Sequence, residues 1–256
     1  MLLATYTLWR RDITRFLRQR SRVLGALGTP LVFWLLLGSG LGSSFTEGNL
    51  GVPSGGYLEY FYPGTLALIL LFTAIFSTIS VIEDRHEGFL QGVMVSPVPQ
   101  VAIVLGKLLG GTTLAVLQAL LFLLLAPLGN VQIQLSSLPL LLFVLALFAF
   151  ALTGLGFILA WIMDSTQGFH AIMNLVLFPM WLLSGAVFPP TGAASWVQVA
   201  MLINPMTYGV SALRDILTHS SGSGGITSMN YSLTFIAMFG LLTFILSSLS
   251  VRYRHT

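Results

Sequence analysis

Most of this chain consists of long stretches without a single Asp, Glu, Lys or Arg. The uncharged runs are 23–46, 60–82, 108–163, 165–213 and 216–251. A helix needs roughly 20 apolar residues, at about 1.5 Å of rise per residue, to cross the hydrocarbon core of a bilayer. Only 7% of the residues are charged, whereas soluble domains typically carry about 25%. The sequence therefore predicts an all-α polytopic membrane protein.

Six transmembrane helices are expected from the lengths of the apolar segments. They are placed near 23–42, 61–82, 101–126, 138–163, 171–188 and 231–251. The run 189–230 differs, because its apolar pieces 195–203 and 206–219 are each too short to span and are separated by Asn204-Pro205. We expect two short re-entrant or outer helices there. With no internal repeat, residues 1–256 are predicted to form a single membrane domain.

Residues 1–22 are expected to form an amphipathic helix at the membrane surface. Their apolar side chains recur at steps of three and four. These are Leu2, Tyr6, Trp9, Ile13, Phe16 and Leu17. Six arginines crowd the second half of the segment and suit the anionic lipid headgroups of the cytoplasmic leaflet. A basic tail that only sets the topology is the alternative interpretation.

The distribution of Lys and Arg predicts the orientation of the chain. With six spans, both termini lie on the same side of the membrane. Placing that side in the cytoplasm leaves ten Lys and Arg residues inside and only Arg214 outside. The segment 83–98, between the second and third spans, then also faces the cytoplasm.

Five consecutive ionisable side chains, Glu83 to Glu87, open this segment. Carboxylates are favoured at a helix N-terminus, and a short helix is expected after Gly88. Ser96-Pro97 ends it, because proline disfavours the helical conformation of the preceding residue. One face of this helix would expose Phe89, Leu90, Val93 and Met94. Charges collect in any loop that meets water, but the apolar face and the proline stop favour a docking element.

The stretch EDRHEGFLQGVMVSPV (83–98) resembles the motif of ABC-2 family permeases of ABC transporters. The matching residues are Glu83, Arg85, Glu87, Gly88, Leu90, Ser96, Pro97 and Val98, and the departures are Asp84, His86, Phe89 and Gln91. A second stretch, LSGAVFPP (183–190) followed by LINPMTYGVSALRDIL (202–217), is similar to the segment between spans five and six in nodulation-factor, antibiotic and polysaccharide exporters. Together the resemblance covers the whole chain.

The resemblance implies a type V exporter-like architecture in a bacterial cytoplasmic (inner) membrane. Segment 83–98 would be the coupling helix that docks on a separate ATP-binding cassette subunit, with two such ATPases serving a permease homodimer. ATP and Mg would sit on that partner, and this chain would bind no cofactor. The ATPase-coupling residues would be Glu83, Asp84, Arg85, Glu87, Gly88, Phe89, Leu90, Val93, Met94, Ser96 and Pro97. The short outer helices would cap the pathway.

The fifth span would lie beside the dimer axis in such a family. Asn174, Phe178 and Trp181 are therefore candidates for the pathway or the dimer axis. Polar side chains within spans more often form interhelical hydrogen bonds than contact cargo. Asn174 is the first of the three to test.

Several kinds of chemistry are excluded by missing residues. A P-loop needs Gly-x-x-x-x-Gly-Lys-Ser/Thr, but Gly106-Lys107 is followed by Leu108 and preceded by Val101 where the first glycine belongs. His86-Glu87 lacks the second histidine of a zinc-protease motif, because position 90 is leucine. The basic residues report membrane orientation rather than nucleic-acid binding.

We therefore expect a permease of an ATP-driven exporter without an ATPase site of its own. A transport pathway lined by these apolar spans, with little buried charge, fits an amphiphilic, drug-like, lipid-linked or glycan cargo. Two alternatives are a membrane scaffold or biogenesis factor that docks an ATPase without transporting, and an ATP-independent channel or carrier. Cargo-stimulated ATPase activity would separate the first from an exporter, and conduction without a partner would identify the second.

Overall fold

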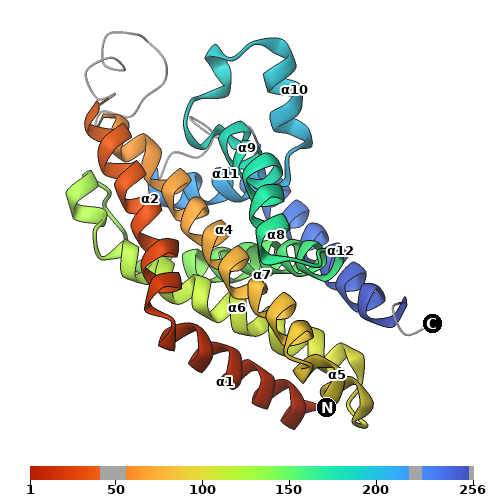
Figure 1. Ribbon diagram of the computed structural model, residues 1–256. Helices are drawn as coiled ribbons and strands as arrows, with labels where there is room; N and C mark the ends of the chain where they lie inside the picture. The colour runs from red at the N-terminus through yellow and green to blue at the C-terminus, as the bar shows by residue number, and fades with distance from the viewer. Residues whose placement is uncertain (41–55, 219–226, 254–256) are drawn as a thin grey trace.

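The computed structural model describes residues 1–40, 56–218 and 227–253 as a bundle of helices (Figure 1). No strand occurs within these ranges, and six helical segments are long and apolar enough to cross a membrane. The predicted fold class is confirmed. The segments are α2 (Arg20–Gly40), α4 (Tyr57–His86), α6 (Gln100–Leu123), α7 (Leu138–Ile162, preceded by η2, Leu135–Ser137), the composite span Thr166–Ala186 and α12 (Met229–Tyr253).

The second span, α4, is the central helix of the bundle. Its apolar side chains are buried around most of its circumference, and it packs against α2, α6 and α7. A helix that is hydrophobic all round belongs in a core rather than against lipid or water. Gly64 permits one close approach, because a Cβ there would lie 2.7 Å from the Cβ of Ala186 and 2.8 Å from its carbonyl oxygen.

The helix α4 extends further than expected, to His86 rather than 82. Glu83 to His86 therefore form the last turn of the second span, and the interpretation of these residues as the N-terminus of the next helix is wrong. The physical reason is Gly88, whose φ of +75° lies in the left-handed region that glycine adopts without strain. The next helix, α5 (Phe89–Val95), begins only after this break.

The fifth span is irregular. It runs through α8 (Thr166–Ile172), η3 (Met173–Leu177), α9 (Phe178–Trp181) and η4 (Leu182–Ala186), and η3 and η4 are π-helical. It starts earlier than 171, because the Ser165 hydroxyl accepts a hydrogen bond from the Gly168 amide and caps the first turn. Helical geometry is lost at Leu183 and at Gly185, where φ is +77°.

Two short helices follow the fifth span, at the positions expected. They are α10 (Ser195–Ile203) and α11 (Pro205–Thr218), with the short turn η5 (Pro190–Gly192) before them. Figure 1 shows α10 at the top of the molecule, while α11 lies within the bundle. The turn η1 (Ala126–Gly129) lies between α6 and α7.

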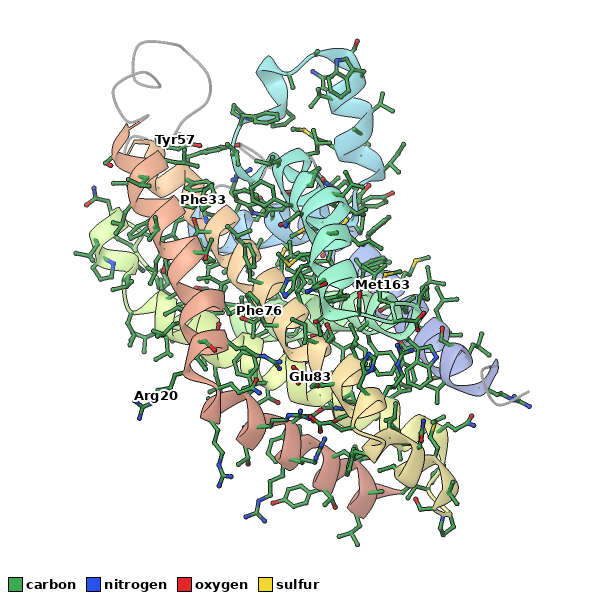
Figure 2. The ribbon with its side chains drawn as sticks, viewed as in Figure 1. Arg20, Phe33, Tyr57, Phe76, Glu83 and Met163 are labelled. Atoms are coloured by element: carbon green, nitrogen blue, oxygen red, sulfur yellow. The ribbon has the colours of Figure 1, made fainter. Side chains whose placement is uncertain are left out.

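The amphipathic helix α1 (Leu2–Arg18) and α5 lie together at the lower end in Figure 1, opposite α10. The helix α1 packs along α6, with Leu8, Asp12 and Phe16 on its buried face. Figure 2 places Tyr57 and Glu83 at opposite ends of α4. We call the end that carries α1, α5 and Glu83 the α5 end, and the other the α10 end.

Candidate functional site at the α5 end

The short helix predicted after Gly88 is present as α5, and it ends where expected. The Ser96 hydroxyl donates to the Val93 carbonyl at 2.5 Å, and Ser96 itself has extended backbone geometry (φ −75°, ψ 156°) before Pro97. Left-handed glycine on one side and an extended Ser-Pro on the other separate α5 from the spans α4 and α6. This helix is therefore a distinct segment between two breaks.

The apolar face of α5 was predicted to be exposed, and this prediction is wrong. Leu90 is only 1% exposed, and Phe89, Val93 and Met94 pack half-buried against the same core. Burial of apolar area within the bundle removes it from water, so this face turns inward. The outward residues are Gln91, Gly92 and Val95, of which Val95 is 89% exposed.

Asp84 forms the centre of a charged cluster beneath α5. Its carboxylate, 0% exposed, accepts two hydrogen bonds from Arg11, at 2.9 and 2.7 Å. Arg15 donates to it at 2.6 Å and the Lys107 ammonium at 2.5 Å. Lys107 also donates to Asp12 at 3.0 Å and to the Ser80 hydroxyl at 3.2 Å. Three elements, α1, α4 and α6, thus meet at one carboxylate.

Two further carboxylates complete the cluster at its edge. Glu83 pairs with Arg22 and, at 3.1 Å, with Arg15. The Glu87 carboxylate lies 2.8 Å from Arg15 and is 56% exposed. We call the following residues the α5-end cluster: Arg11, Asp12, Arg15, Arg22, Glu83, Asp84, Glu87 and Lys107. It holds four cations and four carboxylates, so its formal charge is zero.

Charge balance is what makes this burial tolerable, because an unpaired buried ion costs several kcal/mol. Burial raises the pKa of Asp12, and the attraction of Lys107 offsets this only in part. The hydrogen bond with Asp84 raises the pKa of Arg11. Arg11 also lies 3.7 Å from the centre of the Phe89 ring, which ties α5 to α1.

The predicted coupling residues thus fall into two groups. Asp84, Leu90 and, to a lesser extent, Glu83 and Phe89 are engaged inside the chain, whereas Glu87 and Pro97 reach the surface. Gln91 and Val95, which were not among the predicted residues, are exposed beside them. Sequence reasoning missed Asp12 and Lys107 as partners of this segment. The signal for Asp12 was available: it lies four residues from both Leu8 and Phe16, on the buried face of α1.

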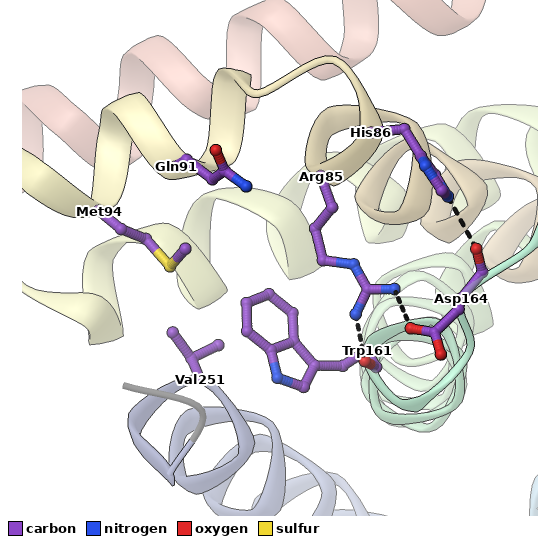
Figure 3. Close-up of a pocket in the computed structure, with 7 residues that line it drawn as sticks. All are labelled: Arg85, His86, Gln91, Met94, Trp161, Asp164 and Val251. Atoms are coloured by element: carbon purple, nitrogen blue, oxygen red, sulfur yellow. Dashed lines mark hydrogen bonds and ion pairs between the residues drawn. The ribbon is translucent and has the colours of Figure 1, made fainter. Parts of the chain in front are cut away.

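Arg85 links the end of α4 to the end of α7, as Figure 3 shows. Its guanidinium donates to the Trp161 carbonyl at 2.6 Å and to the Met163 carbonyl, and it lies 3.5 Å from the Asp164 carboxylate. His86 Nε2 donates to the Asp164 carbonyl at 2.7 Å. These bonds satisfy carbonyls that the end of a helix leaves without intrahelical partners.

A cavity of about 310 Å³ lies between α5 and the ends of α7 and α12 (Figure 3). Gln91 and Met94 face it from α5, Trp161 from α7 and Val251 from α12, with Arg85, His86 and Asp164 beside them. On its other side α5 rests on α1 through Arg11 and Phe89. The helix is therefore supported on one side and bordered by open space on the other.

The three candidates in the fifth span do not share one environment. Asn174 is exposed, beside Leu175 and Val176, which are 77% and 49% exposed. Phe178 is half-buried against Phe33. Trp181 is 0% exposed and donates to the Gly64 carbonyl at 2.8 Å, so its side chain packs inside the subunit. A position of these three residues at a pathway or dimer axis stays a prediction.

Comparison with known proteins matches residues 4–218 to the family described as ABC-2 type transporter. Nodulation protein J of Rhizobium leguminosarum bv. trifolii is 30% identical over 82% of this chain and 79% of its own length. Nodulation protein J of Rhizobium meliloti is 26% identical over 96% and 92%. Inner membrane transport permease YhhJ of Escherichia coli is 28% identical over 63% of this chain and 44% of its own length. The chain belongs to the ABC-2 type transporter family and is a membrane permease subunit of an ABC transporter.

Proposed function

We propose that this permease is the transmembrane half of an ATP-driven exporter that docks a separate ATP-binding subunit at the α5 end. Two permease chains would pair with two ATPases, and the α5 end would face the cytoplasm. The orientation rests on charge: apart from Arg214, every Lys and Arg within the described ranges lies toward the α5 end, on α1, the first turn of α2, the end of α4, α6 or the end of α12.

The observation that carries the proposal is the α5-end cluster. A force on α5 reaches α4 directly through Gly88, α1 through Arg11 and Phe89, and α6 through the Asp84–Lys107 pair. Buried charged hydrogen bonds resist separation, because each group would be left unpaired. Movement of α5 by nucleotide-driven closure of the ATPase would therefore move three elements together.

The cargo we propose is amphiphilic, drug-like, lipid-linked or glycan in character. Of the three relatives described above, two carry the name Nodulation protein J and the third the name inner membrane transport permease. The outward-facing side of the fifth span supports an apolar or amphiphilic cargo, since Leu175 and Val176 lie there beside the neutral Asn174.

Replacing Glu87 with Arg tests the docking role. Glu87 is the most exposed carboxylate of the α5-end cluster, so the change leaves the buried pairs in place. We expect the variant to fold and to keep its thermal stability, but to lose permease-dependent ATPase activity in proteoliposomes with its ATP-binding partner. Glu87→Gln, which keeps the size of the side chain, should show a smaller loss.

Wild-type export and ATPase coupling by Glu87→Arg would contradict the proposal. Stable binding of an ATPase without cargo stimulation would instead support the scaffold alternative. Cargo movement through the permease alone, with no ATPase present, would support the channel or carrier alternative.

A further inference from the structure

One buried cation lies far from the α5-end cluster. Arg214, on α11, is only 6% exposed at the opposite end of the bundle. Its Nη2 donates to the Gly185 carbonyl at 2.8 Å, and its guanidinium carbon lies 4.3 Å from the centre of the Tyr60 ring. Buried cations within a membrane protein are costly and usually functional, and coupling through α5 does not use this one.

The partner of Arg214 is the broken part of the fifth span. Leu183 (φ −86°, ψ 21°) and Gly185 (φ +77°) interrupt the helix, so carbonyls in this stretch need donors from elsewhere. Side chains of α4, of α11 and of Asn204, just before α11, supply them. We call these residues the carbonyl clamp: Tyr57, Tyr60, Asn204 and Arg214.

Each clamp residue reaches a carbonyl in or beside the break. The Tyr60 hydroxyl donates to the Gly185 carbonyl at 2.9 Å, so this oxygen accepts from both Tyr60 and Arg214. The Tyr57 hydroxyl donates to the Val187 carbonyl at 2.8 Å. Asn204 Nδ2 donates to the carbonyls of Leu183 at 2.9 Å and Met180 at 2.5 Å.

The helix α11, which carries Arg214, is itself packed closely within the bundle. Eleven of its 14 residues are buried, and at Gly209 a Cβ would lie 2.3 Å from the Phe148 ring of α7. On the other side of the break, Gly64 of α4 meets Ala186 so closely that no side chain fits. The break is thus held between α4 and α11, with Arg214 supplying the only charged donor among the clamp contacts described above.

We infer that Arg214 is a positioning residue for transport: it fastens the break in the fifth span to α11, at the same Gly185 carbonyl that Tyr60 of α4 holds, so that the break and α11 move as one unit at the α10 end. This inference rests on the proposed export function. A charge-assisted bond is stronger than a neutral one, and the Tyr60 ring adds attraction to the guanidinium. Loss of Arg214 would release the Gly185 carbonyl from α11, while Asn204 would still hold Leu183 and the rest of the bundle would stay packed.

The first test uses the chain alone, which contains no cysteine. Ser184→Cys introduces a single thiol in the break at a position 1% exposed, and its alkylation by a water-soluble maleimide reports opening. Adding Arg214→Met should accelerate labelling by about tenfold or more, since a bond to a charged group is lost. Arg214→Lys should restore much of the protection, because an ammonium still donates and still lies over the ring.

Two controls separate release of the clamp from general unfolding. Gln198→Ala removes donors to the Pro190 and Ala193 carbonyls, outside the break, and should leave Ser184→Cys labelling unchanged. A thiol at Thr153→Cys, 0% exposed within α7, should stay protected when Arg214 is Met. Unchanged labelling of Ser184→Cys in the Arg214→Met background would overturn the inference, and so would equal exposure of Thr153→Cys.

The second test uses the complex with its ATP-binding subunit. ATP should alter the labelling rate of Ser184→Cys when Arg214 is present, and this response should disappear with Arg214→Met and return with Arg214→Lys. A retained ATP response in Arg214→Met would overturn the positioning role. Failure of any ATPase to bind the chain would count against the proposed function instead, while the labelling of the chain alone would still decide whether the clamp exists.

Discussion

Asp84 is a charged residue in a fully buried position, and its environment explains why the chain tolerates it. Arg11, Arg15 and Lys107 all donate to its carboxylate. A cation 73 residues away in the sequence and another 23 residues away are brought to the same pair of oxygen atoms. Each of these charged groups stabilises the fold only when the others are present, because any one alone would be a buried unpaired charge.

Removing the charge at position 84 should therefore strongly lower the stability of the folded protein. Asp84→Asn leaves three cations facing a neutral amide, and we expect a loss of about 3–5 kcal/mol in the free energy of unfolding. Combining it with Lys107→Met should cost less than the sum of the single changes, because the buried ammonium is removed as well. Thermal unfolding of the purified protein in detergent measures both.

The matched control is Glu87→Gln in the same cluster. Glu87 is 56% exposed, and pairs of exposed charges contribute only about 0–1 kcal/mol. Equal destabilisation by Asp84→Asn and Glu87→Gln, or strict additivity of Asp84→Asn with Lys107→Met, would show that the cluster is not a cooperative unit.

The six arginines of α1 and of the first turn of α2 fall into two sets with different surroundings. Arg11, Arg15 and Arg22, the last just inside α2, pair with carboxylates of α4 and its end. No carboxylate within the described part of the chain lies at ion-pair distance from Arg10, Arg18 or Arg20, and Figure 2 shows Arg20 pointing away from the bundle. Exposed Leu2, Tyr6 and Leu17 lie on the same helix as Arg10 and Arg18. The second set is exposed and therefore available to a lipid surface.

This division predicts different effects for two triple variants. Arg10/Arg18/Arg20→Gln should keep its melting temperature in detergent but lose the stabilisation that anionic phospholipid provides, since about 1 kcal/mol of surface attraction is lost per basic residue. Arg11/Arg15/Arg22→Gln should lower the melting temperature in every lipid. Melting in vesicles of phosphatidylcholine with and without phosphatidylglycerol distinguishes them, and an identical response of the two variants would refute the division.

The two ends of the molecule differ in charge: within the described residues, the α10 end carries only Glu59, Arg214 and Asp215. The α5 end holds the balanced cluster and the exposed arginines, whereas α10 carries no charged residue and exposes Trp196, Val199 and Ile203. Aromatic residues favour the membrane–water boundary and basic residues favour the cytoplasmic side. Both features support the orientation that we propose, with the α5 end in the cytoplasm.

The absence of native cysteine allows a direct check of this orientation. A single thiol at Val95→Cys, on α5, should react with a membrane-impermeant maleimide only after spheroplasts are opened. A thiol at Trp196→Cys, on α10, should react in intact spheroplasts. The reverse pattern would place the ATPase-facing surface at the wrong end and would contradict the proposed function.

The elements could be predicted well from the sequence because they depend on local features. Apolar length identified the spans, Asn204-Pro205 separated the two short helices, and Gly88 with Ser96-Pro97 bounded α5. The irregular fifth span was harder, since its loss of helical geometry at Leu183 and Gly185 depends on donors from α4 and α11. The prediction that the apolar face of α5 is exposed was wrong, because periodicity shows which side chains share a face but not what that face contacts.

The sequence by itself determined that this chain is embedded in a membrane, how many times it crosses, and where the short helix α5 begins and ends. These properties follow from runs of consecutive residues, each judged against water or hydrocarbon. The tertiary structure alone decided that Asp84 is buried against Lys107, that the apolar face of α5 turns inward, and that Arg214 reaches Gly185. These contacts join residues distant in the chain, and they form only where packing brings complementary groups together and excludes water from them.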